Sequence, residues 1–154
     1  MTNFIKYVVS GKHTTYEPKF PEKYGGEFPI IARSQWEIAF MRWCDFNPSI
    51  LNWASETIVV PYYDPIKKKN RRYYPDFQLK IKDKAGNVKI YMVEIKPHKE
   101  VILPKRGKKA EKTRIYESST FITNKAKWAA AEDFCKKHGW YFRIITEKEL
   151  FKGQ

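Results

Sequence analysis

Three ionisable residues have the types and the spacing of a metal site: Asp76, Glu94 and Lys96. Asp76 stands at the start of an alternating apolar run, and Glu94 and Lys96 stand at the end of a second one. The polar, glycine-containing turn between the runs predicts a β-hairpin with strands near 72–82 and 88–96. Glu94 and Lys96 then share one face of a strand, and the pairing can bring Asp76 close to them. Two carboxylates and an ammonium at a sheet edge can hold a hard divalent cation and a water molecule.

The alternation also predicts which side chains of the hairpin point the same way. In the first strand one face carries Phe77, Leu79 and Ile81, and the other carries Asp76, Gln78 and Lys80. In the second strand one face carries Tyr91, Val93 and Ile95, and the other carries Met92, Glu94 and Lys96.

A helix is predicted over 33–46, because Trp36, Phe40 and Trp43 form a helical apolar stripe. Ser34 is a suitable N-cap, and Glu37 three residues later completes a capping box. Capping alone would account for Glu37, so its place in a metal site is the less secure of its two readings.

The rest of the chain supplies the remaining elements. They are an irregular arm over 1–32 with one short strand at 4–9, a strand at 56–63, a basic connection at 64–72, a basic loop at 103–112, a helix at 118–138 capped by Gly139, a strand at 140–145 and a short helix from Thr146 to Leu150. The basic and aromatic residues of the arm are expected to wrap the core, with a course along nucleic acid as the alternative. The order of elements is therefore helix, three strands, helix, strand.

Length and charge bound the class of protein. A chain of 154 residues predicts one domain, here 33–154, preceded by the arm 1–32. Thirty Lys and Arg against seventeen Asp and Glu give a formal net charge of +13. So large an excess of positive charge favours a polyanionic partner, and nucleic acid is the first candidate.

Several classes of protein are disfavoured. The two cysteines, Cys44 and Cys135, form no metal-binding spacing and no disulfide framework, so buried thiols in a reduced compartment are expected. The chain shows no signal peptide and no apolar run long enough to span a membrane. His13, His98 and His138 have no metal-ligand spacing with the cysteines.

These motifs, taken in order, resemble the PD-(D/E)xK nuclease superfamily. Glu37 lies on the first helix, Pro75-Asp76 opens a strand, and Glu94-Ile95-Lys96 closes the next strand. Within the superfamily the chain is similar to the head completion nucleases of tailed phages and to TnsA-type transposon endonucleases over roughly residues 30–150. The short sequence motifs that carry this similarity are Arg33-Ser34-Gln35-Trp36-Glu37, Trp53-Ala54-Ser55-Glu56, Tyr74-Pro75-Asp76-Phe77, Glu94-Ile95-Lys96-Pro97 and Asn124-Lys125-Ala126-Lys127-Trp128. TnsA-type enzymes commonly carry Gln where this chain has Glu94.

The resemblance implies an α/β fold with a restriction-endonuclease-like core: a helix, a three-stranded antiparallel meander, a helix and a strand. It also implies that Asp76, Glu94 and the backbone carbonyl of Ile95 hold Mg²⁺, for which Mn²⁺ substitutes. Lys96 would orient or deprotonate the attacking water and offset charge on the phosphorane. Glu37 would bind the metal through water or bind a second ion.

The DNA-binding surface is predicted from charge alone. The expected phosphate contacts are Arg33, Lys67, Lys68, Lys69, Arg71, Arg72, Lys105, Arg106, Lys108, Lys109, Lys125 and Lys127. For Lys125 and Lys127 a solvated helix face is an equal alternative. No recognition helix or zinc finger is present, so backbone and shape readout with little sequence specificity is expected.

The leading hypothesis is a Mg²⁺-dependent DNA endonuclease that processes phage DNA at head completion. The alternative is a structural DNA-binding protein of a phage head or transposition assembly, which keeps the fold but does not cleave. The sequence leaves open whether the substrate is duplex, flap or junction DNA, whether the chain forms a homodimer, and whether phage head or portal proteins bind it. The expected location is the host cytoplasm or the virion, with no membrane partner, and an RNA substrate is disfavoured.

Overall fold

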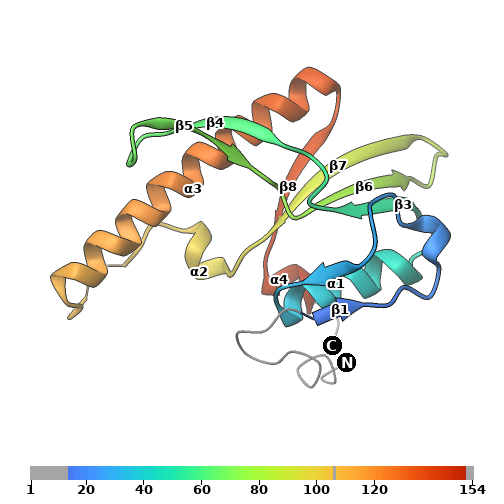
Figure 1. The fold of residues 1–154 in the computed structure, drawn as a ribbon, viewed down its shortest axis with the longest axis horizontal. Coiled ribbons are helices and arrows are strands. Elements are labelled where there is room, and N and C mark those ends of the chain that lie inside the picture. The colour runs from blue at the N-terminus through green and yellow to red at the C-terminus, as the bar shows by residue number, and fades with distance from the viewer. Residues whose placement is uncertain (1–13, 106, 152–154) are drawn as a thin grey trace.

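The core of the molecule is a four-stranded sheet with the strand order β3-β6-β7-β8 (Figure 1). The computed structural model describes residues 14–105 and 107–151. The strands of the sheet are β3 (Ile50–Ser55), β6 (Phe77–Lys82), β7 (Val88–Ile95) and β8 (Tyr141–Ile145). The first three pair antiparallel and β8 joins β7 in parallel, which confirms the predicted meander followed by a returning strand.

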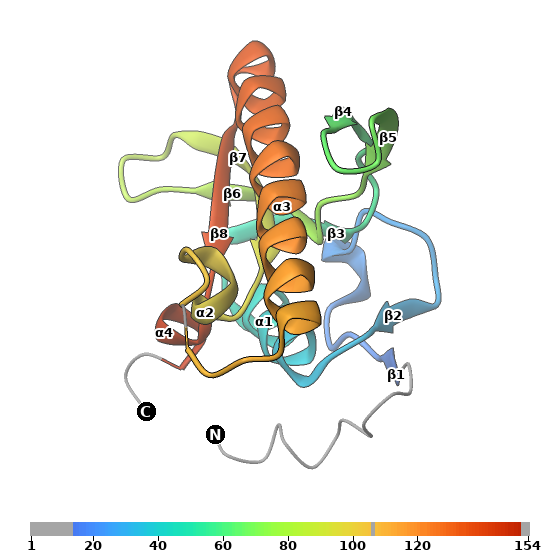
Figure 2. The same cartoon turned by 90° about the vertical axis from the view of Figure 1, so that its left-hand side faces the viewer.

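Two helices cover opposite faces of this sheet. They are α1 (Gln35–Phe46) and α3 (Glu111–His138), and two single-turn helices, α2 (His98–Val101) and α4 (Glu147–Leu150), lie near the ends of β7 and β8. In Figure 2, α3 runs lengthwise across the sheet while α1 lies behind it. The described part of the chain contains no helix that is both long and apolar enough to cross a membrane.

The face toward α1 is an apolar core, as the strand alternation predicts. Phe77, Leu79 and Val93 pack there against Phe40 and Met41 of α1. Met92 points to the other face, where it packs with Trp128, Ala131 and Cys135 of α3. Both cysteines are buried free thiols, as expected from their spacing. Within the predicted helical stripe, Phe40 is buried but Trp43 is 46% exposed, because α1 turns that position away from the sheet.

The prediction that residues 56–63 form the first strand of the meander is wrong. The strand that pairs with β6 is β3, with Ser55 opposite Phe77, and the chain leaves the sheet at Glu56, which has a positive φ of 53°. Residues Val60–Asp64 (β4) and Lys69–Tyr73 (β5) instead form a separate two-stranded hairpin. The stretch predicted as a basic connection is therefore largely a strand, and β4 packs against α3 rather than in the sheet.

The later elements differ from the prediction mainly in where α3 begins. The helix begins at Glu111 rather than near Ser118, and its first turns carry exposed Ile115 and Tyr116. Because these turns extend past the sheet (Figure 1), they show no apolar periodicity that a sequence could reveal. The C-cap Gly139 adopts φ 72°, and Thr146 starts α4 with a capping box, both as predicted.

The N-terminal arm is fastened to the C-terminal end of α1. Two short strands, β1 (Thr14–Tyr16) and β2 (Ile30–Ala32), pair antiparallel, and a 3₁₀ turn, η2 (Pro21–Lys23), lies between them. The Lys23 ammonium donates to the carbonyls of Cys44, Asp45 and Asn47, each at 2.8 Å, and so satisfies carbonyls that the helix end leaves free. The arm thus wraps the core as expected; the strand predicted at 4–9 lies outside the described residues.

Candidate active site

Asp76 and Glu94 meet where β6 begins and β7 ends. Phe77 of β6 pairs with Val93 of β7. Asp76, which precedes Phe77, and Glu94, which follows Val93, therefore lie opposite each other on the face away from α1. The N–H of Ile95 donates to Oδ2 of Asp76 at 2.7 Å, which holds this carboxyl group against β7. Glu94 is only 6% exposed, and its Oε1 has no hydrogen-bond partner among the described residues. The hairpin therefore brings the two carboxyl groups together, as the sequence predicts.

Burial disfavours the ionised form of both carboxyl groups, and the charge of Glu94 also disfavours that of Asp76. Burial, followed by the charge of Glu94, raises the pKa of Asp76 to about 8 against the opposing effects of the Ile95 N–H and Lys96. Burial also raises the pKa of Glu94, although Lys96 and the hydroxyl of Tyr73 favour its carboxylate. The pKa values of both acids are raised although lysines lie nearby, and a divalent cation with oxygen ligands would relieve this condition.

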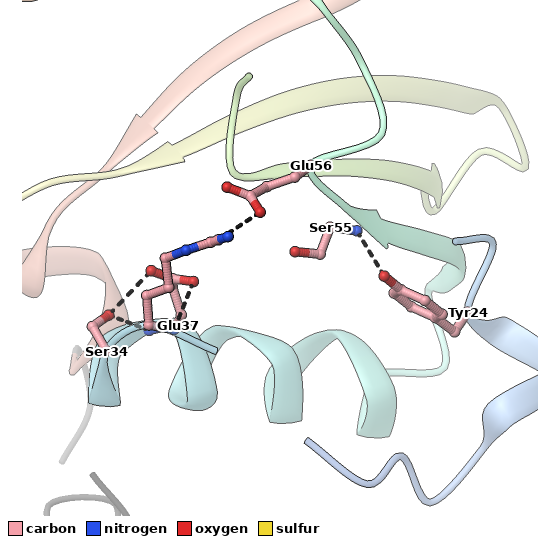
Figure 3. Close-up of polar contacts among 6 residues, drawn as sticks. Tyr24, Ser34, Glu37, Ser55 and Glu56 are labelled. Carbon is pink, nitrogen blue, oxygen red and sulfur yellow. Dashed lines mark hydrogen bonds and ion pairs between the residues drawn. The ribbon is translucent and has the colours of Figure 1, made fainter. Parts of the chain in front are cut away.

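Glu37 lies at the start of α1 and acts as part of a helix cap (Figure 3). Its N–H donates to Oγ of Ser34 at 3.1 Å, and its carboxylate accepts the N–H of Arg33 at 3.3 Å. Burial and the charge of Asp76 raise the pKa of Glu37 to about 7, so the two carboxyl groups face the same region. In the part of the chain that the structure describes, however, no three acidic, His or Cys side chains gather closely enough to form a metal cluster. The close acidic pair therefore consists of Asp76 and Glu94, and Glu37 does not join it in a three-residue cluster.

Glu56 is a neighbour of the site that the sequence did not reveal. Its N–H donates to the carbonyl of Asp76 at 3.0 Å, and its carboxylate forms an ion pair with Arg33 (Figure 3). The hydrogen bond that Arg33 donates to Glu56 raises the pKa of Arg33, and the charges of Glu37 and Asp76 raise it further. Arg33, predicted to contact phosphate, is therefore already paired here, at the edge of the acidic site.

Tyr73 and Lys127 border the site from the other side. Tyr73, the last residue of β5, is buried, and its hydroxyl lacks a hydrogen-bond partner. Lys127 of α3 places its ammonium 5.7 Å from the centre of the Tyr73 ring. Burial, then the charge of Lys96, lowers the pKa of Lys127, while Glu94 raises it. The sequence suggested Lys127 only as a phosphate contact and did not suggest Tyr73, although Tyr73 stands three residues before Asp76.

The other basic residues predicted to bind DNA lie on the β4–β5 hairpin, on α3 and on the loop before it. Lys67, Lys68, Lys69 and Arg72 are exposed on the hairpin, as are Lys105, Lys108 and Lys109 on the loop and Lys125 on α3. Arg71 pairs with Asp64 at 3.3 Å, Lys109 pairs with Glu117 at 2.7 Å, and Arg106 lies outside the described residues. Figure 2 shows the hairpin and α3 side by side, and β4 packs on that helix. The hairpin and α3 therefore lie together, and each places one residue near Glu94, Tyr73 from the hairpin and Lys127 from α3.

A groove with a volume of about 620 Å³ lies between α2, the loop and α3. Lys105 and Lys109 line it together with Tyr116 and Asn124, whereas Asp76 and Glu94 do not. This groove is thus separate from the acidic pair.

A sheet with an antiparallel meander, a parallel returning strand, a helix on each face and an acidic pair with a lysine defines the PD-(D/E)xK class of nuclease fold. Comparison with known proteins agrees. The family model described as "TnsA-like endonuclease N terminal" matches residues 47–147. The chain is also 40% identical over 153 residues to the head completion nuclease of Enterobacteria phage T4, a match that covers 94% of this chain and 97% of that protein. The chain belongs to the TnsA-like endonuclease family, and it is a nuclease.

Proposed function

We propose that the protein is a divalent-metal-dependent DNA endonuclease with little sequence specificity. The observation that carries the proposal is the pair formed by the half-buried Asp76 and the buried Glu94, whose pKa values are both raised although Lys96 lies beside both and Lys127 lies near Glu94. The orphaned Oε1 of Glu94 is a second sign that a partner belongs there.

Mg²⁺ fits this set of ligands, and Mn²⁺ is expected to substitute for it. Asp76, Glu94 and the carbonyl of Ile95 would hold the ion; all three donors are oxygen atoms, which Mg²⁺ prefers, and it keeps several water molecules. When bound, a divalent cation lowers the pKa of water and neutralises charge on the phosphate. Glu37 would act through water or on a second ion, since its carboxylate is also engaged by the helix cap.

The residues of the chain would divide the hydrolysis between them. Lys96, on the same face of β7 as Glu94, would orient the attacking water and offset negative charge on the phosphorane. The water oxygen bonds to phosphorus, one phosphorus–oxygen ester bond breaks, and the departing oxygen takes up a proton. Burial of Glu94 keeps bulk water from competing at the reacting centre.

The exposed cations support DNA as the substrate. The hairpin, the loop and α3 present exposed positive charge, which suits contacts to a phosphate backbone. No base-reading element stands out among the described residues, so we expect shape and backbone readout.

We further propose that the cleavage processes phage DNA at head completion, in the host cytoplasm or on the virion, with head or portal proteins as partners. The support is the name and the near-full-length match of the T4 relative.

Cleavage of supercoiled and linear duplex DNA in Mg²⁺ or Mn²⁺ tests the activity. Asp76→Ala and Lys96→Ala are expected to abolish metal-dependent nicking while DNA binding persists. Lys80→Ala is the matched control, because Lys80 is an exposed lysine on β6. Salt-sensitive DNA binding by the wild type without cleavage of duplex, branched or single-stranded DNA would contradict the proposal and favour a structural DNA-binding protein.

A further inference from the structure

Two unsatisfied polar atoms of the site face each other. Among the described residues, the buried side-chain atoms without a hydrogen-bond partner are Nε1 of Trp53, Oη of Tyr73, Oε1 of Glu94 and Nε1 of Trp128. Glu94 supplies the one carboxylate oxygen in this set, and the Tyr73 hydroxyl is a group that can donate to it. After burial, the charge of Glu94 is the largest cause that raises the pKa of the Tyr73 phenol, and Tyr73 in turn favours the ionised form of Glu94. The hydroxyl and the carboxylate are therefore neighbours that stop short of hydrogen-bond geometry.

A buried hydroxyl without a partner destabilises a protein, so it needs an explanation. Tyr73 is 4% exposed, and a phenylalanine there would bury the same ring without the desolvation of an oxygen. Buried tyrosine hydroxyls usually find a partner. An acceptor that reaches the hydroxyl only when the site is loaded would account for its presence.

The Tyr73 ring is held from two directions. The Tyr62 ring of β4 meets it edge to face, with the ring centres 6.5 Å apart, and the Lys127 ammonium of α3 lies 5.7 Å from its centre. Neither contact uses the hydroxyl. The ring is thus fixed while its oxygen remains available to Glu94, which is the arrangement that orients a ligand from outside the metal's own coordination.

We propose that Tyr73 is a positioning residue of the metal site. Its hydroxyl donates a hydrogen bond to the Glu94 carboxylate when a cation is bound, and so fixes the orientation in which Glu94 meets that cation. The inference rests on the proposed metal-dependent function. It gives the β4–β5 hairpin a role beyond charge, because the hairpin delivers Tyr73 to the site from outside the central sheet.

Titration calorimetry of Mn²⁺ into the metal-free, full-length protein without DNA tests the proposal. Tyr73→Phe is expected to weaken Mn²⁺ binding by about tenfold, the usual effect of losing an outer partner of a metal ligand. Tyr62→Phe is the matched control, because it removes the phenol oxygen of the other buried tyrosine in the same aromatic pair, and that oxygen lies near Asp64 and Arg71. Its Mn²⁺ affinity should equal that of the wild type.

The melting temperature without metal separates positioning from a merely structural role. Tyr73→Phe removes an unsatisfied buried oxygen, so it should raise this temperature by about 2–4 °C while Mn²⁺ affinity falls. Unchanged Mn²⁺ affinity in Tyr73→Phe, or a fall in affinity together with a lower melting temperature, would overturn the proposal. If the wild type bound no Mn²⁺, the proposed function itself would fail; if the wild type and Tyr62→Phe bound it and Tyr73→Phe bound it equally well, only the role of Tyr73 would fail.

Discussion

Two aspartates of this protein, the buried Asp64 and the half-buried Asp76, have opposite environments. Asp64 is 1% exposed and accepts hydrogen bonds from the N–H groups of Ile66 and Lys67, from Arg71 and from the Thr123 hydroxyl. Burial raises the pKa of Asp64, but the hydrogen bonds and the charge of Arg71 outweigh it, so the pKa lies below its ordinary value.

The Asp76 carboxyl group accepts a hydrogen bond from the Ile95 N–H and has a second carboxyl group, that of Glu94, as its neighbour. Its pKa is raised to about 8. The difference shows that burial alone does not mark a reactive acid: a structural carboxylate is surrounded by donors that the fold supplies, whereas Asp76 and Glu94 lack enough positive charge within the chain. An external cation is the missing component that we propose.

The largest expected effect is the loss of cleavage in Asp76→Asn. This substitution keeps the shape of the side chain and an acceptor for the Ile95 N–H but removes the negative charge, so the rate of DNA cleavage should fall by more than about 10³-fold. The melting temperature without metal should not fall, because one of two repelling acids is neutralised. Cleavage within tenfold of wild type in a gel assay would show that Asp76 is not a ligand.

A smaller effect is expected where α3 meets the site. Lys127→Met should lower the cleavage rate at saturating DNA by about tenfold, because Lys127 is half-buried beside Glu94 and Lys96. Lys125→Met is the matched variant, since Lys125 is an exposed lysine whose ammonium lies 5.6 Å from the centre of the Phe121 ring. Lys125→Met should reduce the slope of the logarithm of the DNA-binding constant against the logarithm of the salt concentration by about one. Its cleavage rate should fall less than that of Lys127→Met. Identical behaviour of the two variants in both measurements would make Lys127 an ordinary phosphate contact.

Asp64→Asn should affect stability rather than chemistry. The amide cannot accept all the hydrogen bonds that the carboxylate accepts, so the melting temperature should fall by several degrees. Cleavage at a temperature where the variant is folded should stay within a few-fold of wild type. A variant that is as stable as wild type but inactive would remove the distinction between the two aspartates.

The smallest expected effect is the pH dependence of stability without metal. The pKa values of Glu37, about 7, and Asp76, about 8, are raised above the values near 4 that the unfolded chain has. The folded protein therefore retains protons that the unfolded chain has lost, and the free energy of unfolding should fall as the pH rises from about 4 to about 8. Thermal melts in EDTA should show a decline of a few degrees across this range, and the decline should be shallower in Asp76→Asn. An increase of stability with pH that Asp76→Asn leaves unchanged would contradict the raised pKa of Asp76.

Much of the acidic pair could be predicted from sequence because its geometry is local. Asp76, Glu94 and Lys96 lie on one hairpin, and strand alternation with a short turn determines which side chains face the same way. The capping role of Ser34 and the end of α3 at Gly139 were predictable for the same reason, since caps depend on a few adjacent residues.

The parts that sequence did not reveal depend on contacts between distant segments. The run over 56–63 has strong strand character, yet β4 pairs with β5 and packs on α3, while the less regular β3 joins the sheet. That arrangement is what brings Tyr73 and Lys127 to Glu94. Glu56 was missed similarly, because its position depends on a left-handed turn that only the folded chain shows.

Calorimetric titration of Mn²⁺ in two buffers of different ionisation enthalpy tests the central claim most directly, because it counts the protons released as the ion binds. At pH 7 the raised pKa of Asp76 leaves it largely protonated, and ligands must lose their protons to bind metal. We expect about one proton released per ion in the wild type and in Asp64→Asn, and no comparable binding in Asp76→Asn. Binding without proton release, or binding that survives Asp76→Asn, would contradict the assignment of the Asp76 and Glu94 pair as the metal site.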